Sequence, residues 1–187
     1  MTGRQRGGRV RPRDLRASDA EREAVIGVLT DAYAEGRLTL EEHEERMRRA
    51  YEARTLGELS TIVFDLPNGT AGLPDLYDGP VAAVLTRRHR GGRFVLPDRL
   101  VLGAVAGTVT LDLRAAVFAT RDVVVDAVCA GGLVVVLAPP TVRVDVDAGR
   151  MVVVRRVRGR RTSGTPTWSV LLRAHGLGRV TVRTTRY

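Results

Sequence analysis

Four segments of this chain repeat one pattern: AGTVTL (106–111), AGGLVV (130–135), AGRMVV (148–153) and LGRVTV (177–182). In each, a glycine precedes residues with the apolar alternation of a β-strand. One short strand cannot bury its own apolar face, but a stack of similar strands, each turned at a glycine, buries a continuous core. The repeats therefore predict an all-β solenoid, short and β-helix-like, over residues 91–187.

The phase of the repeats predicts which side chains form that core. Residues two and four positions after each glycine are expected to point inward: Val109, Leu111, Leu133, Val135, Met151, Val153, Val180 and Val182. On that assignment an apolar stripe points outward in the middle of the stack: Val134, Val136, Val152 and Val154. Because water would disfavour such a stripe, we expect it to be covered by helices from the N-terminal third or to bind another chain.

Two of the repeat glycines are expected to have a backbone role. Gly131 and Gly149 are placed at corners or close backbone approaches, where a side chain would clash or would require positive φ. Replacement of either glycine by valine is therefore expected to destabilise the sheet.

The N-terminal third carries three helix-start signals. Ser18, Thr39 and Thr55 are each followed three residues later by a glutamate, which is the pattern of a capping box. Apolar residues at helical spacing follow each start: Val25, Leu29 and Tyr33; Leu40, Met47, Ala50 and Tyr51; and Leu56, Leu59, Ile62, Val63 and Leu66. With Gly36 ending the first helix and Pro67 stopping the third, the sequence predicts a three-helix module over residues 14–67, capable of folding on its own.

This module resembles a known family. The motifs RASDAERE, AYAEGRLTLEEHEER, ARTLGEL and DLP, within residues 14–67, are similar to the short helical domain of unknown function found in many actinobacterial proteins and related to the SHOCT domains. The resemblance implies an interaction or oligomerisation module without catalysis. His43 stands where that family tends to carry an aromatic residue, and we interpret it as a partly buried core histidine.

The remaining segments complete the expected organisation. Residues 1–13 carry five arginines and no acid, which predicts a basic disordered tail. Residues 68–90 are predicted to be a linker, since residues 68–80 are rich in Gly, Pro and Asp. Arg87, Arg88 and Arg90 form a dense basic patch at its end, either a solvated turn or a contact for nucleic acid or lipid. The expected fold class is α+β.

The β half also resembles a family. Its opening RGGRFVLPDRL, followed by AGTVTLDLRAA, AGGLVVVLAPPTVRVDVDAG and GLGRVTVR, is similar to the C-terminal domain of LiaF-like proteins of the cell-wall-active antibiotic response. The resemblance implies a β-helix-like domain that takes part in sensing or regulating envelope stress. LiaF-like proteins usually carry transmembrane helices ahead of this domain, and no such span is visible in this sequence.

The charge is divided between the two halves. Residues 14–67 carry thirteen acids against seven arginines, whereas residues 81–187 carry eighteen arginines against six aspartates. Beyond Asp147 there are ten arginines and no acid. The C-terminal end should therefore attract polyanions, and nucleic acid, anionic lipid and the chain's own acidic module all qualify.

Several classes of function find little support. Cys129 is the only cysteine, which excludes an internal disulfide and favours a small buried residue. The sequence has no nucleophile elbow, P-loop, zincin helix or dinucleotide fingerprint, and Asp145 with Asp147 is too small a set of ligands for Ca²⁺. No cofactor, metal or catalytic residue is expected. With no signal peptide visible, we expect a cytoplasmic protein, or one held by charge at the inner face of the cell membrane.

Three functions remain. The first is a non-enzymatic regulatory or scaffold protein of the envelope stress response that acts through protein–protein contacts, a homo-oligomer among them. The second is a nucleic-acid-binding protein, which acidic helices and few aromatic residues disfavour. The third is a self-assembling structural β-solenoid.

Overall fold

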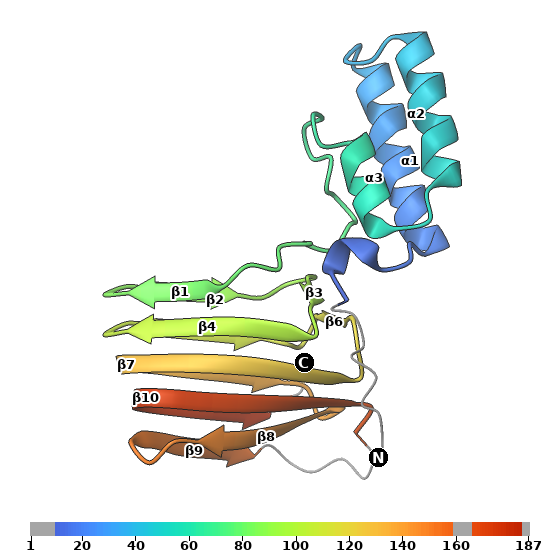
Figure 1. The fold of residues 1–187 in the computed structure, drawn as a ribbon. Coiled ribbons are helices and arrows are strands. Elements are labelled where there is room, and N and C mark those ends of the chain that lie inside the picture. Colours follow the sequence, from blue (N-terminus) through green and yellow to red (C-terminus); the bar gives the residue numbers. More distant parts are fainter. Residues whose placement is uncertain (1–9, 159–165, 185–187) are drawn as a thin grey trace, which may run out of the picture.

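The computed structural model describes residues 10–158 and 166–184. Three helices form one end of the molecule, and a large sheet of parallel strands, folded back on itself around a core, forms the rest (Figure 1). The prediction of an α+β fold is confirmed. No helix in the described ranges is long and apolar enough to cross a membrane.

The helices begin where the sequence predicts. A 3₁₀ turn precedes them, and the order is η1 (Pro12–Asp14), α1 (Asp19–Ala34), α2 (Leu40–Glu52) and α3 (Leu56–Ile62). Ser18, Thr39 and Thr55 each close a capping box with the glutamate three residues on, so that two otherwise unpaired backbone N–H groups are satisfied at each start. Of the predicted disordered tail, residues 1–9 lie outside the described residues, and η1 shows that its end is ordered.

The helical core contains fewer of the apolar residues than the sequence pattern predicts. Its buried members include Val25, Leu29, Ala50, Leu56, Leu59, Ile62 and Val63. Tyr33, Leu40 and Tyr51 belong to the predicted apolar faces, and yet they are exposed. The reason is that α3 has only seven residues and cannot cover the full length of the α1–α2 pair.

The strands pair in parallel throughout both sheets. They are β1 (Val81–Val84), β2 (Arg87–Arg90), β3 (Val95–Leu96), β4 (Arg99–Val105), β5 (Thr108–Asp112), β6 (Val117–Phe118), β7 (Asp122–Ala138), β8 (Val142–Ala148), β9 (Val152–Arg158) and β10 (Trp168–Thr184). The predicted linker is therefore too long, because β1 and β2 already belong to the large sheet. Residues 68–80 contain no helix and no strand longer than a single bridge.

The strands form layers that we call rungs, each with two halves on opposite sides of the core. β7 and β10 supply both halves of a rung by bending midway, while β1 with β2, β4 with β5, and β8 with β9 supply the others. The rungs do not stack in chain order. β10 lies between β7 and the β8–β9 rung, so the last repeat is inserted between the second and the third.

Inward side chains stack in columns across the rungs. One column runs Leu100, Val125, Leu172, Val146, and another runs Val109, Val134, Val180, Val154. The inner members of each column are buried completely, whereas Val146 and Val154 on the terminal β8–β9 rung are partly exposed. Each rung thus covers the apolar face of its neighbour, as the repeats require.

Glycines mark the corners, although not all at the predicted positions. Gly131 has φ of +69°, as expected of a corner glycine. Gly149 has neither positive φ nor a close neighbour, because the nearest atom to a side chain there would be the Ala174 carbonyl oxygen at 3.6 Å. A close approach occurs instead at Gly178, where a Cβ atom would lie 2.7 Å from the Gly132 carbonyl oxygen.

The helices join the sheet through the corner opposite these glycines. β3 and β6 pair there, and Val95 and Val117 pack into the helical core while Phe94 and Leu96 pack into the sheet core. Arg93 adds an ion pair to Glu21 of α1 at 3.0 Å. The helices therefore sit at the β1–β2 end of the stack (Figure 1), and do not cover the predicted valine stripe.

We predict that Gly178→Ala lowers the free energy of unfolding by about 1–3 kcal/mol, because the added methyl group meets backbone that cannot move without separating two rungs. Urea denaturation followed by circular dichroism measures the change. Gly149→Ala is the matched control and should cost less, since space is available at that turn. Equal losses in both variants would contradict this account of the corners.

Candidate functional site

The predicted valine stripe is part of the core. Val134, Val136 and Val152 are buried, and Val154 faces inward at the open end of the stack. The outward assignment was wrong for the second and third repeats. In β7 the chain carries one extra corner residue, so Gly132, not Gly131, pairs with Gly178 and sets the phase of the residues after it. In the third repeat, the turn before Val152 shifts the phase in the same direction.

The basic patch is divided between two roles. Arg90 points toward the core at the β1–β2 end, where it pairs with Asp75 and lies over the rings of Tyr77 and Phe94 at 5.4 and 4.7 Å. It closes that end of the stack with a charge-paired, mostly buried side chain. Arg88 is on the same inward face of β2 as Arg90 but is exposed, whereas Arg87 lies on the outer face. The patch is a strand of the terminal rung, and the prediction of a simple solvated turn is wrong.

A group of exposed apolar side chains lies at the glycine corners, on the side of the sheet away from β3 and β6. The chain turns there through residues with positive φ: Leu85, Ala106, Gly131 and Gly176. Large apolar side chains are exposed around these turns: Val84, Leu85, Val105, Val128, Met151, Val153 and Leu177. We call these seven residues the corner edge. Leu85 is 80% exposed, Met151 66% and Leu177 60%, so they are not core residues at the margin of the sheet.

A shallow groove runs across the rungs along the corner edge. Its volume is about 630 Å³, and its wall includes Leu85, Met151, Leu177 and the backbone of Gly107, Gly132 and Gly178. The glycines are required at its floor because rungs approach one another closely there. Arg87 and Arg179 stand at its sides.

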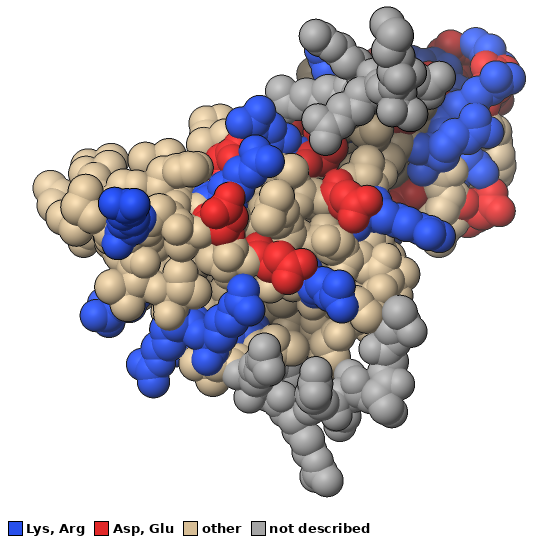
Figure 2. Space-filling model, turned by 60° about the horizontal axis from the view of Figure 1, so that its bottom comes forward, with Lys and Arg blue, Asp and Glu red and all other residues tan. Residues whose placement is uncertain are grey.

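The charge around the corner edge has one sign. The five segments that build it, bounded at matching register as 82–90, 103–111, 128–136, 148–156 and 175–182, contain seven arginines and no aspartate or glutamate. Figure 2 shows the same separation, with uncharged surface and arginines at the far end of the sheet and the visible acids nearer the helices. Two aspartates elsewhere in the sheet are paired, Asp126 with Arg99 and Asp112 with Arg114. The corner edge is therefore both apolar and electropositive.

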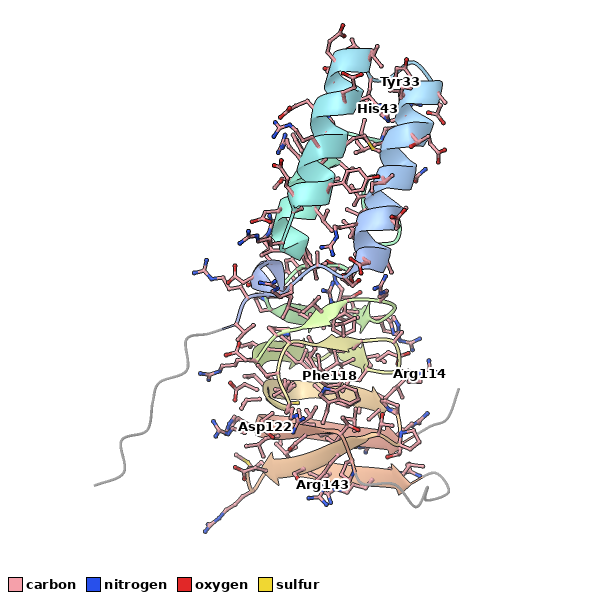
Figure 3. All side chains as sticks on the ribbon, turned by 90° about the vertical axis from the view of Figure 1, so that its right-hand side faces the viewer. Tyr33, His43, Arg114, Phe118, Asp122 and Arg143 are labelled. Atoms are coloured by element: carbon pink, nitrogen blue, oxygen red, sulfur yellow. The ribbon has the colours of Figure 1, made fainter. Side chains whose placement is uncertain are left out.

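A second apolar surface lies on the helices. Leu40, Met47 and Tyr51 share one face of α2 at helical spacing, and Leu40 and Tyr51 are at least half exposed; we call these three residues the α2 stripe. Tyr33 of α1 stacks on His43 at 4.8 Å between ring centroids, at the end of the helices far from the sheet (Figure 3). His43 is partly buried, as predicted, and its Nε2 atom has no hydrogen-bond partner within residues 10–158 and 166–184.

The described residues contain no cluster of potential metal ligands. No group of three or more His, Cys, Asp or Glu side chains in these ranges could hold a metal ion. Cys129 is buried, as predicted, and desolvation raises the pKa of its thiol, which disfavours the reactive thiolate. Asp145 and Asp147 are exposed on the outer surface of β8.

Sequence reasoning missed the corner edge because it assigned residues by phase within strands. Leu85 and Leu177 lie in or beside turns, where alternation carries no information about burial. Two signals were available. Large aliphatic residues stand beside the turn glycines, and acids are absent from all five segments.

Comparison with known proteins gives matches to the helices and to most of the chain. Residues 15–67 match the family model described as the DUF1707 SHOCT-like domain. Uncharacterized protein Rv0966c of Mycobacterium tuberculosis (strain ATCC 25618 / H37Rv) is 34% identical over 165 residues, which cover 84% of this chain and 82% of that protein. Uncharacterized protein Rv0048c of the same strain is 45% identical over 51 residues, covering 27% of this chain and 18% of that protein. No solved structure matches.

We predict that Val134→Ala lowers the free energy of unfolding by about 2 kcal/mol, since it leaves a cavity between two rungs. Val153→Ala, the same change on the outer surface, should alter it by less than about 0.5 kcal/mol. Chemical denaturation of both variants tests the reassignment. A larger loss of stability in Val153→Ala than in Val134→Ala would support the original assignment, in which Val153 points inward and Val134 outward.

A pH prediction concerns Asp112. Arg114 donates hydrogen bonds to this buried carboxylate from Nε at 2.9 Å and Nη2 at 2.6 Å, and these lower the pKa of Asp112. Because the folded pKa lies below the unfolded value of about 3.9, the pair stabilises the fold above that pH and the contribution is lost as pH falls.

Asp112→Asn should therefore cost about 1–2 kcal/mol at neutral pH. Its deficit relative to the parent should shrink in acid, measured by urea denaturation across pH. Asp145→Asn, at an exposed position, is the control. A deficit that is independent of pH would show that the ion pair is not its cause.

Proposed function

This chain belongs to the same family as uncharacterized protein Rv0966c of Mycobacterium tuberculosis and carries an N-terminal DUF1707 SHOCT-like domain, and we propose that it is a non-enzymatic scaffold or regulatory protein of the cell-envelope stress response. In this proposal it acts by holding partners together through direct contacts, and carries no cofactor. Its location is the cytoplasm, at the inner face of the cell membrane.

The observation that carries the proposal is the presence of two exposed apolar surfaces far apart on one molecule. The α2 stripe lies on the helices, and the corner edge lies on the opposite side of the sheet (Figure 1). Contiguous exposed apolar surface on a folded protein marks an interaction site. Two such surfaces, held apart by a rigid stack of strands, suit a molecule that connects one partner to another.

The α2 stripe suits a protein partner. It is flanked on the same helix by exposed acids, Glu41 and Glu44 among them, and by Glu45 and Glu52, which form ion pairs with Arg48. An amphipathic segment with an apolar face and basic margins would complement it, in the way that a helix is recognised through anchors at helical spacing. This matches the interaction role that the SHOCT-like resemblance implies.

The envelope assignment is supported by the β half. Residues 90–187 resemble the LiaF-like C-terminal domain, and we interpret the solenoid-like sheet as a short β-solenoid of that kind, although with its last rung inserted out of order. The family resemblance supplies the stress-response context, and the two surfaces supply the means of acting in it.

The proposal can be tested by photocrosslinking in cells. A photoreactive residue in place of Tyr51 should give a discrete protein adduct, and the adduct should be lost in a Leu40→Asp background because the charge disrupts the stripe. The same photoreactive residue in place of Glu23, exposed on α1, is the matched control. If Tyr51 and Glu23 gave the same products, or none, the α2 stripe would not be a partner site.

A further inference from the structure

We propose that the corner edge docks on an anionic lipid bilayer, with its apolar side chains entering the headgroup–acyl boundary and its arginines binding lipid phosphates. This names the partner of the second surface, and in that respect it rests on the proposed function. The exposure, charge and placement of the residues of this edge support it.

Exposure favours contact with an apolar phase. The most exposed members of the corner edge are aliphatic and are each at least 60% accessible: Val84, Leu85, Met151, Val153 and Leu177. They come from the turn regions of three different rungs, so no single strand end accounts for them. Transfer of such side chains from water to the acyl boundary is favourable in proportion to the apolar area removed from water. Backbone groups at these turns are paired between rungs, as where the Leu85 N–H donates to the Val105 carbonyl oxygen at 2.9 Å and the Ala106 N–H to the Ala130 carbonyl oxygen at 2.8 Å, which lowers the cost of removing them from water.

Charge favours an anionic surface. Arg87, Arg155 and Arg179 are exposed on the outer surface of β2, β9 and β10, beside the apolar tips. None of them takes part in an ion pair among the described residues, unlike Arg90, Arg93, Arg99 and Arg114. Each basic residue near an anionic leaflet strengthens attachment. Their long side chains can lie along apolar surface while the guanidinium reaches a phosphate.

Placement keeps the acidic helices away from the lipid. The turns lie along one side of the sheet, and the helices project away from the sheet at the opposite corner (Figure 1). A membrane in contact with the corner edge would therefore leave the acidic helices in solution, where an anionic surface would not repel them. The α2 stripe would stay accessible to a protein partner in this orientation.

The bilayer explains more of this surface than a nucleic acid does. Arginines alone would serve phosphate binding, and the exposed leucine, methionine and valine tips would then face water in the complex. Single-strand binding relies on aromatic stacking, and the corner edge contains no aromatic residue. A surface that is aliphatic at its crest and cationic at its sides matches the chemical layers of an anionic bilayer.

Vesicle co-sedimentation tests the proposal on the purified chain. We expect binding to vesicles of equimolar phosphatidylcholine and phosphatidylglycerol, weaker binding to phosphatidylcholine alone, and a decrease with added salt. The triple variant Leu85→Asp, Met151→Asp, Leu177→Asp should bind more than about tenfold more weakly. Leu177→Asp alone should also weaken binding, whereas Phe64→Asp, which places one negative charge at an exposed residue of the helical end, should bind like the parent.

Three results would overturn the proposal. They are no binding of the folded parent to the anionic vesicles, equal binding by the parent and the triple variant, and tighter binding to duplex DNA that the triple variant retains. Circular dichroism confirms that each variant is folded, and Arg87→Ala with Arg179→Ala gives a second test that adds no charge. Crosslinking through Tyr51 needs no lipid contact, so its persistence beside failed vesicle binding would leave the proposed function standing.

Discussion

The structure depends on side chains that stack in register between parallel rungs. In parallel pairing, equivalent positions of successive rungs lie side by side, so an apolar residue in one rung requires an apolar residue in the next. The column of Val109, Val134, Val180 and Val154 shows this requirement. The corners must therefore keep the inward-facing positions of every rung aligned with those of its neighbours. The extra glycine in β7 and the register shifts at Ala104 and Leu177 are the local adjustments that do so.

A stack of this kind has two ends, and the chain treats them differently. At the β1–β2 end, Arg90 with Asp75, Tyr77 and Phe94 closes the core, and the helices add further cover. At the β8–β9 end, the inward column position equivalent to Arg90 is taken by Arg156. Inward-facing charge at an exposed rung discourages pairing with another sheet. The two terminal arginines thus bracket an apolar column of Leu111, Val136 and Val182.

The sequence was most informative where local chemistry decides the structure. Three capping boxes located three helix starts because each satisfies its own backbone groups within four residues. The alternation of apolar residues after each glycine identified the strands because it too is a pattern of neighbouring residues. The sequence was misleading where one residue changes the phase. Because β7 has one added corner residue, the residues that follow it point to the face opposite to the predicted one. The prediction therefore placed Val134 on the outer surface, whereas it is buried. The position of β10 was also beyond local reasoning, since strand order depends on contacts between distant segments. The corner edge went unrecognised because turns carry no alternation.

The inserted rung has a consequence for synthesis of the chain. β8 and β9 leave the ribosome before β10, and yet neither has another described rung to pair with until β10 arrives between them and β7. During that interval the β7 edge and the β8–β9 segment are both unpaired, and their valines are open to water. Long-range parallel pairing is slow, and unpaired edges favour aggregation. Arrival of β10 therefore completes the stack, and a nascent chain that still lacks it exposes two unpaired edges that are prone to aggregate.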